Sequence, residues 1–133
     1  MKILIDTNIL ISAALNPDGL PSQAFFKAVT YPNKAIISKQ NLEELRRIFH
    51  KKFATKINLL ESFLEIASNT ISVVPTPVKE YESENNIRDV MDRPILRAAI
   101  YANADVILTG DKDFLEADIS CPQILTAAEF LKL

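Results

Sequence analysis

Aspartates follow apolar segments of the chain, at the points where these segments end. Asp6 comes directly after Lys2–Ile5, and Asp111 comes shortly after Val106–Leu108, with Asp113 close behind. Segments that are apolar at almost every position are typical of strands buried on both faces of a parallel sheet. Ligands of such sheets bind at the carboxyl ends of the strands, near a switch in strand order. These acids are therefore candidates for a common site.

Further acids lie at the starts of predicted helices. Glu44 falls in the first turns of a helix expected over 41–49, and Asp92 stands just before Pro94, a residue favoured in the first turn. Asp89 lies about one turn upstream of Asp92. Carboxylates that converge repel one another, so they stay ionised together where a cation neutralises them. Hard oxygen ligands select Mg²⁺ or Mn²⁺, as one ion or two.

Each acid also has a purely structural interpretation. Asp6 suits the N-cap of a helix that starts near Ile9, and for Asp6 alone this interpretation is as well founded as metal binding. Asp111 and Asp113 suit a polar turn, and Glu44 suits a solvated helix face. The joint placement favours the functional interpretation, because several acids are assigned independently to strand ends or to the first turn of the next helix.

Short apolar runs alternate with segments of helical periodicity along the chain. Strands are predicted at 2–6, 35–37, 71–74, 106–108 and 123–125. Helices are predicted at 22–29, 41–49, 56–67 and 94–102. This alternation predicts an α/β fold of three layers, with a mainly parallel, roughly five-stranded central sheet flanked by helices. Residues 1–133 are expected to form a single domain.

Local signals add three smaller expectations. Thr126 with Glu129 has the pattern of a helix capping box. The polar run 79–86, preceded by prolines, predicts a surface loop. Phe25 and Phe26 lie on the predicted helix 22–29, where we expect them to belong to the core rather than to an interface.

Composition limits the metal chemistry and the compartment. Cys121 and His50 are the only cysteine and histidine, so a zinc site is disfavoured. A lone cysteine fits a reducing compartment, and the N-terminal apolar stretch is too short for a signal peptide. With no run long enough for a membrane span, we expect a cytoplasmic protein. The net charge of −2 gives no general attraction to nucleic acid, so local basic groups must provide it.

An acidic centre for hard divalent cations suits phosphodiester hydrolysis. A bound ion lowers the pKa of a water molecule, which becomes the nucleophile, and the metal charge stabilises the phosphate and the leaving oxygen. This chemistry needs no nucleophile from the protein. The sequence shows no Ser-His-Asp set and, with two glycines in all, no glycine-rich phosphate loop.

The motifs around these acids form an ordered set along the chain. They are Ile3–Leu10, Ser38 with Glu44, Asp92–Leu96 and Thr109–Phe114. Together they resemble the PIN-domain family over essentially the whole chain, and in particular its branch of toxin components of toxin–antitoxin systems, relatives of the VapC-type toxins. The resemblance implies a three-layer PIN-like fold and a Mg²⁺- or Mn²⁺-dependent ribonuclease.

The resemblance also implies a role for each motif residue. The catalytic and metal-binding acids of the family match Asp6, Glu44, Asp92 and Asp111, with Asp113 as an additional metal ligand. Small polar groups that orient such acids or contact the phosphate match Thr7, Asn8, Ser38 and Thr109.

The chain departs from the family pattern just before the third acid. Where the branch often has a more acidic run, this chain has Val90 and Met91 between Asp89 and Asp92. Asp89 therefore competes with Asp92 for the third acidic position. We prefer Asp92, because Pro94 fixes it at the start of a helix.

Basic residues near the acids are candidates for holding RNA phosphates. These residues are Arg88, Arg93, Arg97, Lys112 and Lys39. A second basic run lies on the helix that contains Glu44 and in the connection after it, at Arg46, Arg47, Lys51, Lys52 and Lys56. It either tracks RNA or forms an ordinary solvated face, and the sequence does not favour one interpretation over the other.

Two other functions fit some of the same residues. A phosphotransfer enzyme of the haloacid-dehalogenase type needs a second Asp two residues after the first, where this chain has Asn8. The stronger alternative is a catalytically silent PIN-like module that binds RNA or protein. Metal binding without cleavage would distinguish it. For a toxin relative, the resemblance implies an RNA substrate, a cognate antitoxin protein and self-association, with no membrane partner.

Overall fold

The fold is described by a computed structural model of residues 1–133, the whole chain. Its centre is a sheet of five parallel strands in the order β3-β2-β1-β4-β5. The strands are β1 (Lys2–Ile5), β2 (Lys34–Ser38), β3 (Ile71–Val74), β4 (Val106–Leu108) and β5 (Gln123–Leu125). The predicted α/β fold with a parallel central sheet is confirmed.

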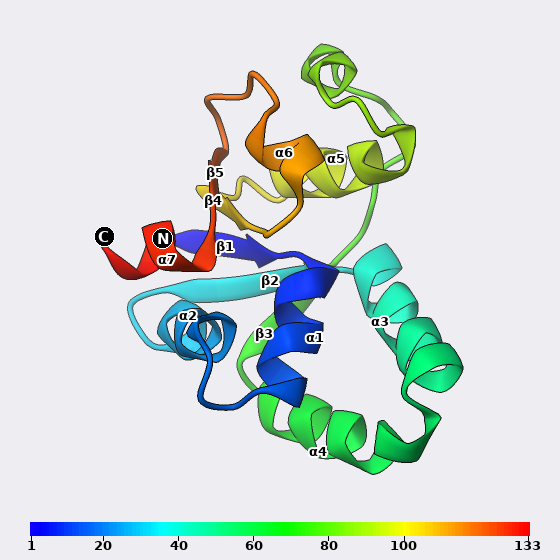
Figure 1. The fold of residues 1–133 in the computed structure, drawn as a ribbon. Helices are drawn as coiled ribbons and strands as arrows, with labels where there is room; N and C mark the ends of the chain where they lie inside the picture. Colours follow the sequence, from blue (N-terminus) through cyan, green and yellow to red (C-terminus); the bar gives the residue numbers. More distant parts are fainter.

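Helices cover both faces of this sheet (Figure 1). The α-helices are α1 (Thr7–Leu15), α2 (Leu20–Val29), α3 (Lys39–Lys52), α4 (Ile57–Ala67), α5 (Arg93–Tyr101), α6 (Lys112–Leu115) and α7 (Ala127–Leu131). Short 3-10 helices are η1 (Ala54–Lys56), η2 (Glu82–Asn86) and η3 (Val90–Asp92). Figure 1 shows α5 and α6 on one side of the sheet and α1 to α4 on the other. None of the helices has the length and apolar character needed to cross a bilayer.

Strand β1 is buried from both sides, which explains its unbroken apolar sequence. Alternate side chains of a strand point to opposite faces of the sheet. Ile3 and Ile5 accordingly belong to the core cluster beneath α1 to α4, whereas Leu4 belongs to the cluster beneath α5. All three side chains are completely buried. The central strand is thus held rigidly by packing on both faces.

The strand order reverses at β1, and this reversal positions the site. From β1 the chain builds outward through β2 to β3, then returns to pair β4 with the other edge of β1. Ile5 of β1 is in register with Leu108 of β4. Because the strands are parallel, Asp6 and Thr109 emerge side by side at their carboxyl ends, at the switch point where ligands of such sheets bind.

Two local predictions need correction. The run 79–86 is not simply a surface loop, because it contains η2, and Glu84 within it is only 3% exposed. Phe25 is in the core as expected, but Phe26 is 55% exposed and is not a core residue. The capping box at the start of α7 is confirmed: Glu129 N donates to Thr126 Oγ1 at 3.1 Å, and Thr126 N donates to Glu129 Oε1 at 3.0 Å.

Candidate acidic site

The carboxylate of Asp6 is buried and fully hydrogen-bonded. Its Oδ1 accepts from Thr7 N at 2.8 Å and from Asn41 Nδ2 at 3.1 Å. Its Oδ2 accepts from Thr109 Oγ1 at 2.8 Å and from Asn8 Nδ2 at 3.1 Å. The side chain is held from α1, α3 and the loop after β4 at once, so it has a fixed orientation.

The structural and functional interpretations of Asp6 are compatible. Asp6 is the N-cap of α1, with extended backbone angles and a side chain that accepts from Thr7 N. A simple cap, however, satisfies only backbone donors at a helix start. Three of the four donors to Asp6 are side chains, those of Asn8, Asn41 and Thr109, and the last two come from distant segments of the chain. Capping alone does not account for this convergence.

Asn41 is a residue of the site that the sequence analysis missed. It is completely buried on α3, and its Oδ1 accepts from Ser38 Oγ at 2.9 Å while its Nδ2 donates to Asp6. Ser38 also caps α3 by accepting from Asn41 N at 3.0 Å. The available signal was the spacing of Asn41 and Glu44, because residues three apart lie on the same helix face.

Thr109 and Asn8 tie the loop after β4 to the start of α1. Thr109 Oγ1 donates to Asp6 and accepts from Asp111 N at 3.0 Å. Asn8 Oδ1 accepts from Gly110 N at 3.0 Å. The Cβ of any residue at Gly110 would meet Asn8 Oδ1 at 3.6 Å, which is ordinary contact. These bonds set the position from which Asp111 caps α6.

A second group of acids lies along η3 and α6. Carboxylate oxygens of Asp89, Asp92 and Asp113 can all lie within 4.8 Å of one another. Asp111 accepts from Asp113 N at 2.9 Å, which links this group to the loop after β4. The structure brings Asp89 and Asp92 into the same group, so the two acids need not compete for one position.

Electrostatics connect the two groups. Burial raises the pKa of Asp6 above 3.8 against the lowering effect of its hydrogen bonds, and the negative charges of Glu44 and Asp111 act in the same direction as burial. Burial, followed by the charges of Asp111 and Asp89, raises the pKa of Asp92 to about 7. Excess negative charge is therefore concentrated at one place.

The residues present fit a hard divalent cation. Asp92 Oδ2 is buried and has no hydrogen-bond partner, which is costly for a carboxylate unless a proton or cation satisfies it. The neighbouring donors are carboxylate oxygens, the ligands that Mg²⁺ and Mn²⁺ prefer. Asp6, Glu44 and Asp111 lie outside the three-carboxylate group itself. The charges of Asp111 and Asp6 act on Asp92, as does a side-chain hydrogen bond with Asp111, whereas the charge of Glu44 acts on Asp6.

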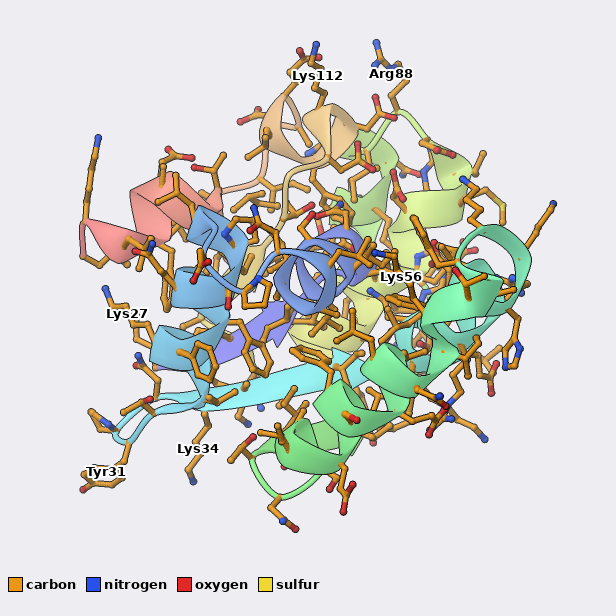
Figure 2. The ribbon with its side chains drawn as sticks, turned by 60° about the horizontal axis from the view of Figure 1, so that its bottom comes forward. Lys27, Tyr31, Lys34, Lys56, Arg88 and Lys112 are labelled. Carbon is orange, nitrogen blue, oxygen red and sulfur yellow. The ribbon has the colours of Figure 1, made fainter.

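The candidate RNA-contacting residues have different surroundings. Arg88 forms an exposed ion pair with Asp113. Arg93 donates through Nε to Ile87 O at 3.1 Å, and its Nη atoms make no hydrogen bond within the chain. Lys112 and Lys39 are exposed. Figure 2 shows Arg88 and Lys112 projecting from the same end of the molecule, whereas Tyr31 and Lys34 lie toward the opposite end.

Arg97, the remaining candidate for RNA contact, differs from these residues because its guanidinium is hydrogen-bonded within the protein. Its guanidinium donates to Glu84 through Nη2 at 2.9 Å and through Nε at 3.1 Å, and to Pro77 O through Nη1 at 3.2 Å. Its side chain is 13% exposed. The N–H donors of Arg97 already bind acceptors within the protein, and these bonds give Arg97 a structural role.

Comparison with known proteins defines the family. A model of the PIN domain matches residues 2–113, and the chain belongs to the PIN-domain family. An uncharacterized protein of Methanocaldococcus jannaschii is 29% identical over 120 residues, which cover 86% of this chain and 74% of that protein. The crystal structure of VapBC2 from Rickettsia felis, bound to a DNA fragment from its promoter, contains a similar chain. It matches with a TM-score of 0.71 and 19% identity, over 95% of this chain and 98% of that one, and shows the shared fold.

Proposed function

We propose that this protein is a Mg²⁺- or Mn²⁺-dependent endoribonuclease that hydrolyses phosphodiester bonds of single-stranded or structured RNA. The observation that carries the proposal is the buried, unpartnered Oδ2 of Asp92 among the carboxylates of Asp89 and Asp113. Membership of the PIN-domain family supports a nuclease activity. The absence of other metal-binding residue types around the group supports hard cations over zinc.

The acids are proposed to bind the metal, and the polar side chains around Asp6 are proposed to orient its carboxylate. One or two divalent ions would be held by Asp92 and Asp113, with Asp89 beside them. The neighbouring acids Asp6, Glu44 and Asp111 are proposed as further ligands. The bound cation would supply an activated water and neutralise charge on the scissile phosphate. The chain itself supplies orientation: Asn8, Asn41 and Thr109 hold the Asp6 carboxylate in place, which fixes the geometry before substrate binds.

Basic groups around the acids are proposed to hold the RNA. Arg93 follows Asp92 directly and keeps free Nη donors for a phosphate oxygen. Lys112 follows Asp111, and Lys39 begins α3 on the strand end next to Asp6. Arg88 is available once it leaves Asp113. Such contacts attract any RNA sequence, so the overall charge of −2 does not prevent local binding.

The test is cleavage of a labelled single-stranded RNA pool with Mn²⁺, Mg²⁺ or EDTA. Asp6→Asn and Glu44→Gln should lose metal-dependent cleavage while they stay folded by circular dichroism. Glu43→Gln, an exposed neighbour on the same helix, is the matched control and should cut like the wild type. Cutting that survives both site substitutions contradicts the assignment. Metal binding without any cutting would favour the catalytically silent RNA-binding module.

We further propose that the enzyme acts in the cytoplasm as the toxin component of a toxin–antitoxin pair, restrained by a cognate antitoxin, and that it self-associates. The fold shared with the VapBC2 structure supports this proposal. Induced expression of the wild type in a bacterial host should arrest growth, and expression of Asp6→Asn should not. Co-expression of a small protein encoded beside it should restore growth. Normal growth with abundant wild-type protein contradicts the toxin proposal.

A further inference from the structure

A polar pocket of about 530 Å³ lies beside the acidic site. Its lining includes Tyr81, Glu82, Asn85, Val90 and Arg93. Val90 belongs to the η3 turn between Asp89 and Asp92, and Arg93 follows Asp92. The pocket and the acids therefore share one turn of the chain, although none of the acids proposed to hold metal lines the pocket.

An ion pair with a buried carboxylate, that of Glu84 with Arg97, is part of the pocket lining. Glu84 is 3% exposed and accepts from Arg97 and, at 2.6 Å, from Tyr81 N. Burial by itself raises the pKa of Glu84, but the bonds from Arg97 and Tyr81 outweigh it and hold the pKa below 4.5. Glu84 and Arg97 thus neutralise each other and anchor η2 on α5. A pocket built in this way exists before a ligand arrives.

We propose that this pocket binds one nucleobase of the RNA, next to the bond that is cut, and prefers a base that carries an exocyclic amino group. The inference rests on the proposed ribonuclease function. The volume lies in the range of small-ligand pockets, which is ample for a base. Tyr81 offers an aromatic ring, the usual platform on which proteins stack unpaired RNA bases.

The charges of the lining decide which part of the nucleotide enters. Glu80 and Glu82 add carboxylates to the pocket, and the Glu80 side chain is 79% exposed, so a phosphate would be repelled there. Carboxylates instead accept hydrogen bonds from amino groups such as N4 of cytosine, and Asn pairs with the edge of adenine. Arg93, at the boundary with Asp92, is left to hold the adjoining phosphate. Uracil has no amino group and should bind least well.

The experiment measures binding of fluorescent octamers of adenylate, cytidylate and uridylate by anisotropy, in Ca²⁺ so that cleavage is not required. The wild type should bind the adenylate and cytidylate octamers at least fivefold more tightly than the uridylate octamer. Tyr81→Ala should weaken binding about tenfold, the scale of one base–aromatic stack. Tyr81→Phe keeps the ring and should bind like the wild type. Glu82→Gln should reduce the preference over uridylate.

Matched controls separate the pocket from general effects. Tyr31→Ala removes a tyrosine that is 92% exposed and lies toward the opposite end from Arg88 (Figure 2). Glu61→Gln removes an exposed carboxylate of α4 that does not line the pocket. Neither should change binding. Tyr81→Ala that stays folded and binds like Tyr31→Ala overturns the proposal, as does equal binding of all three octamers. If the protein cleaves RNA but Tyr81→Ala binds RNA like the wild type, the base-pocket proposal is wrong and the nuclease proposal stands. If the octamers bind as predicted but no RNA is cleaved, the base-pocket proposal stands and the nuclease proposal is wrong.

Discussion

Asp6 and Asp92 lie in the same acidic site, but their surroundings are opposite. Asp6 is 4% exposed, stands on the rigid central part of the sheet and receives four hydrogen bonds from neighbouring groups. Asp92 belongs to a short 3-10 turn, and one of its buried oxygens has no partner. Both carboxyl groups have a raised pKa, to about 7 for Asp92. Only one of them is satisfied by the protein alone.

This difference divides the site into an anchor, Asp6, whose position the protein fixes, and a carboxylate, Asp92, that needs a further partner. The donors around Asp6 stabilise its ionised form and fix its position without any ligand. Asp92 needs a proton or a cation, because an ionised carboxylate with an unpaired buried oxygen is unfavourable. We infer that Asp6 fixes the position of the site. Asp92, with Asp89 and Asp113, provides the carboxylate oxygens that a cation would bind.

The largest effect is expected when the anchor is changed. Asp6→Asn keeps the N-cap, since Asn caps as well as Asp. All four partners of Asp6 donate, so the new amide group faces donors and loses hydrogen bonds. We expect a loss of about 1–3 kcal/mol in the free energy of unfolding, measured with urea at pH 7. Relief of the burial cost of the charge, and of repulsion with Glu44 and Asp111, works in the opposite direction but replaces no bond.

Asp118→Asn is the matched control for this substitution, because Asp118 is exposed. Its unfolding should be unchanged. If Asp6→Asn were as stable as the wild type, the hydrogen bonds would not hold Asp6 in the way described.

A smaller effect of opposite sign is expected at Asp92. Its pKa is raised on folding from 3.8 to about 7, so the folded protein binds a proton more tightly than the unfolded chain between these values. The stability of the metal-free protein should therefore fall as the pH rises through this window. Asp92→Asn removes the effect and should raise the melting temperature in EDTA by roughly a few degrees at pH 8 but not at pH 3.5. Parallel pH profiles for the two proteins would contradict the assignment.

The smallest effect concerns the ion pair of Arg88 with Asp113. The Arg88 side chain is 78% exposed, so Arg88→Gln should leave the melting temperature unchanged. Because Asp113 is then freed for a cation, Mn²⁺ should bind about two- to fivefold more tightly. Arg46→Gln, which breaks a similar exposed pair with Glu61, should change neither quantity. Weaker Mn²⁺ binding by Arg88→Gln would show that Arg88 supports the site instead of competing with it.

The sequence predicted the sheet well because its strands are buried on both faces. The ranges 71–74, 106–108 and 123–125 agree with β3, β4 and β5, since continuous apolar runs between polar turns leave few other assignments. The prediction for Phe26 was wrong because α2 has ten residues, about three turns, and its sequence pattern alone does not decide which of two neighbouring aromatics is buried. Tertiary packing decides between them.

Polar contacts between distant segments were harder to predict. Glu84 lies in a run whose composition is typical of a solvated loop, yet it is buried against Arg97 of α5. Asn41 was overlooked because its spacing from Glu44 places both on one helix face but does not show that Asn41 supports Asp6, which lies 35 residues away. The proposed roles of Asp6, Glu44, Asp92 and Asp111 remain predictions that depend on measured metal binding and cleavage.

The most direct test of the account is calorimetric titration of Mn²⁺ into the protein after removal of metal with EDTA. The wild type should bind Mn²⁺ saturably. Asp92→Asn and Asp113→Asn should each weaken binding by about tenfold or more, whereas Glu116→Gln, an exposed neighbour, should not change it. Absence of binding by the wild type, or unchanged affinity in Asp92→Asn, would contradict the claim that the unpartnered carboxylate of Asp92 is completed by a cation.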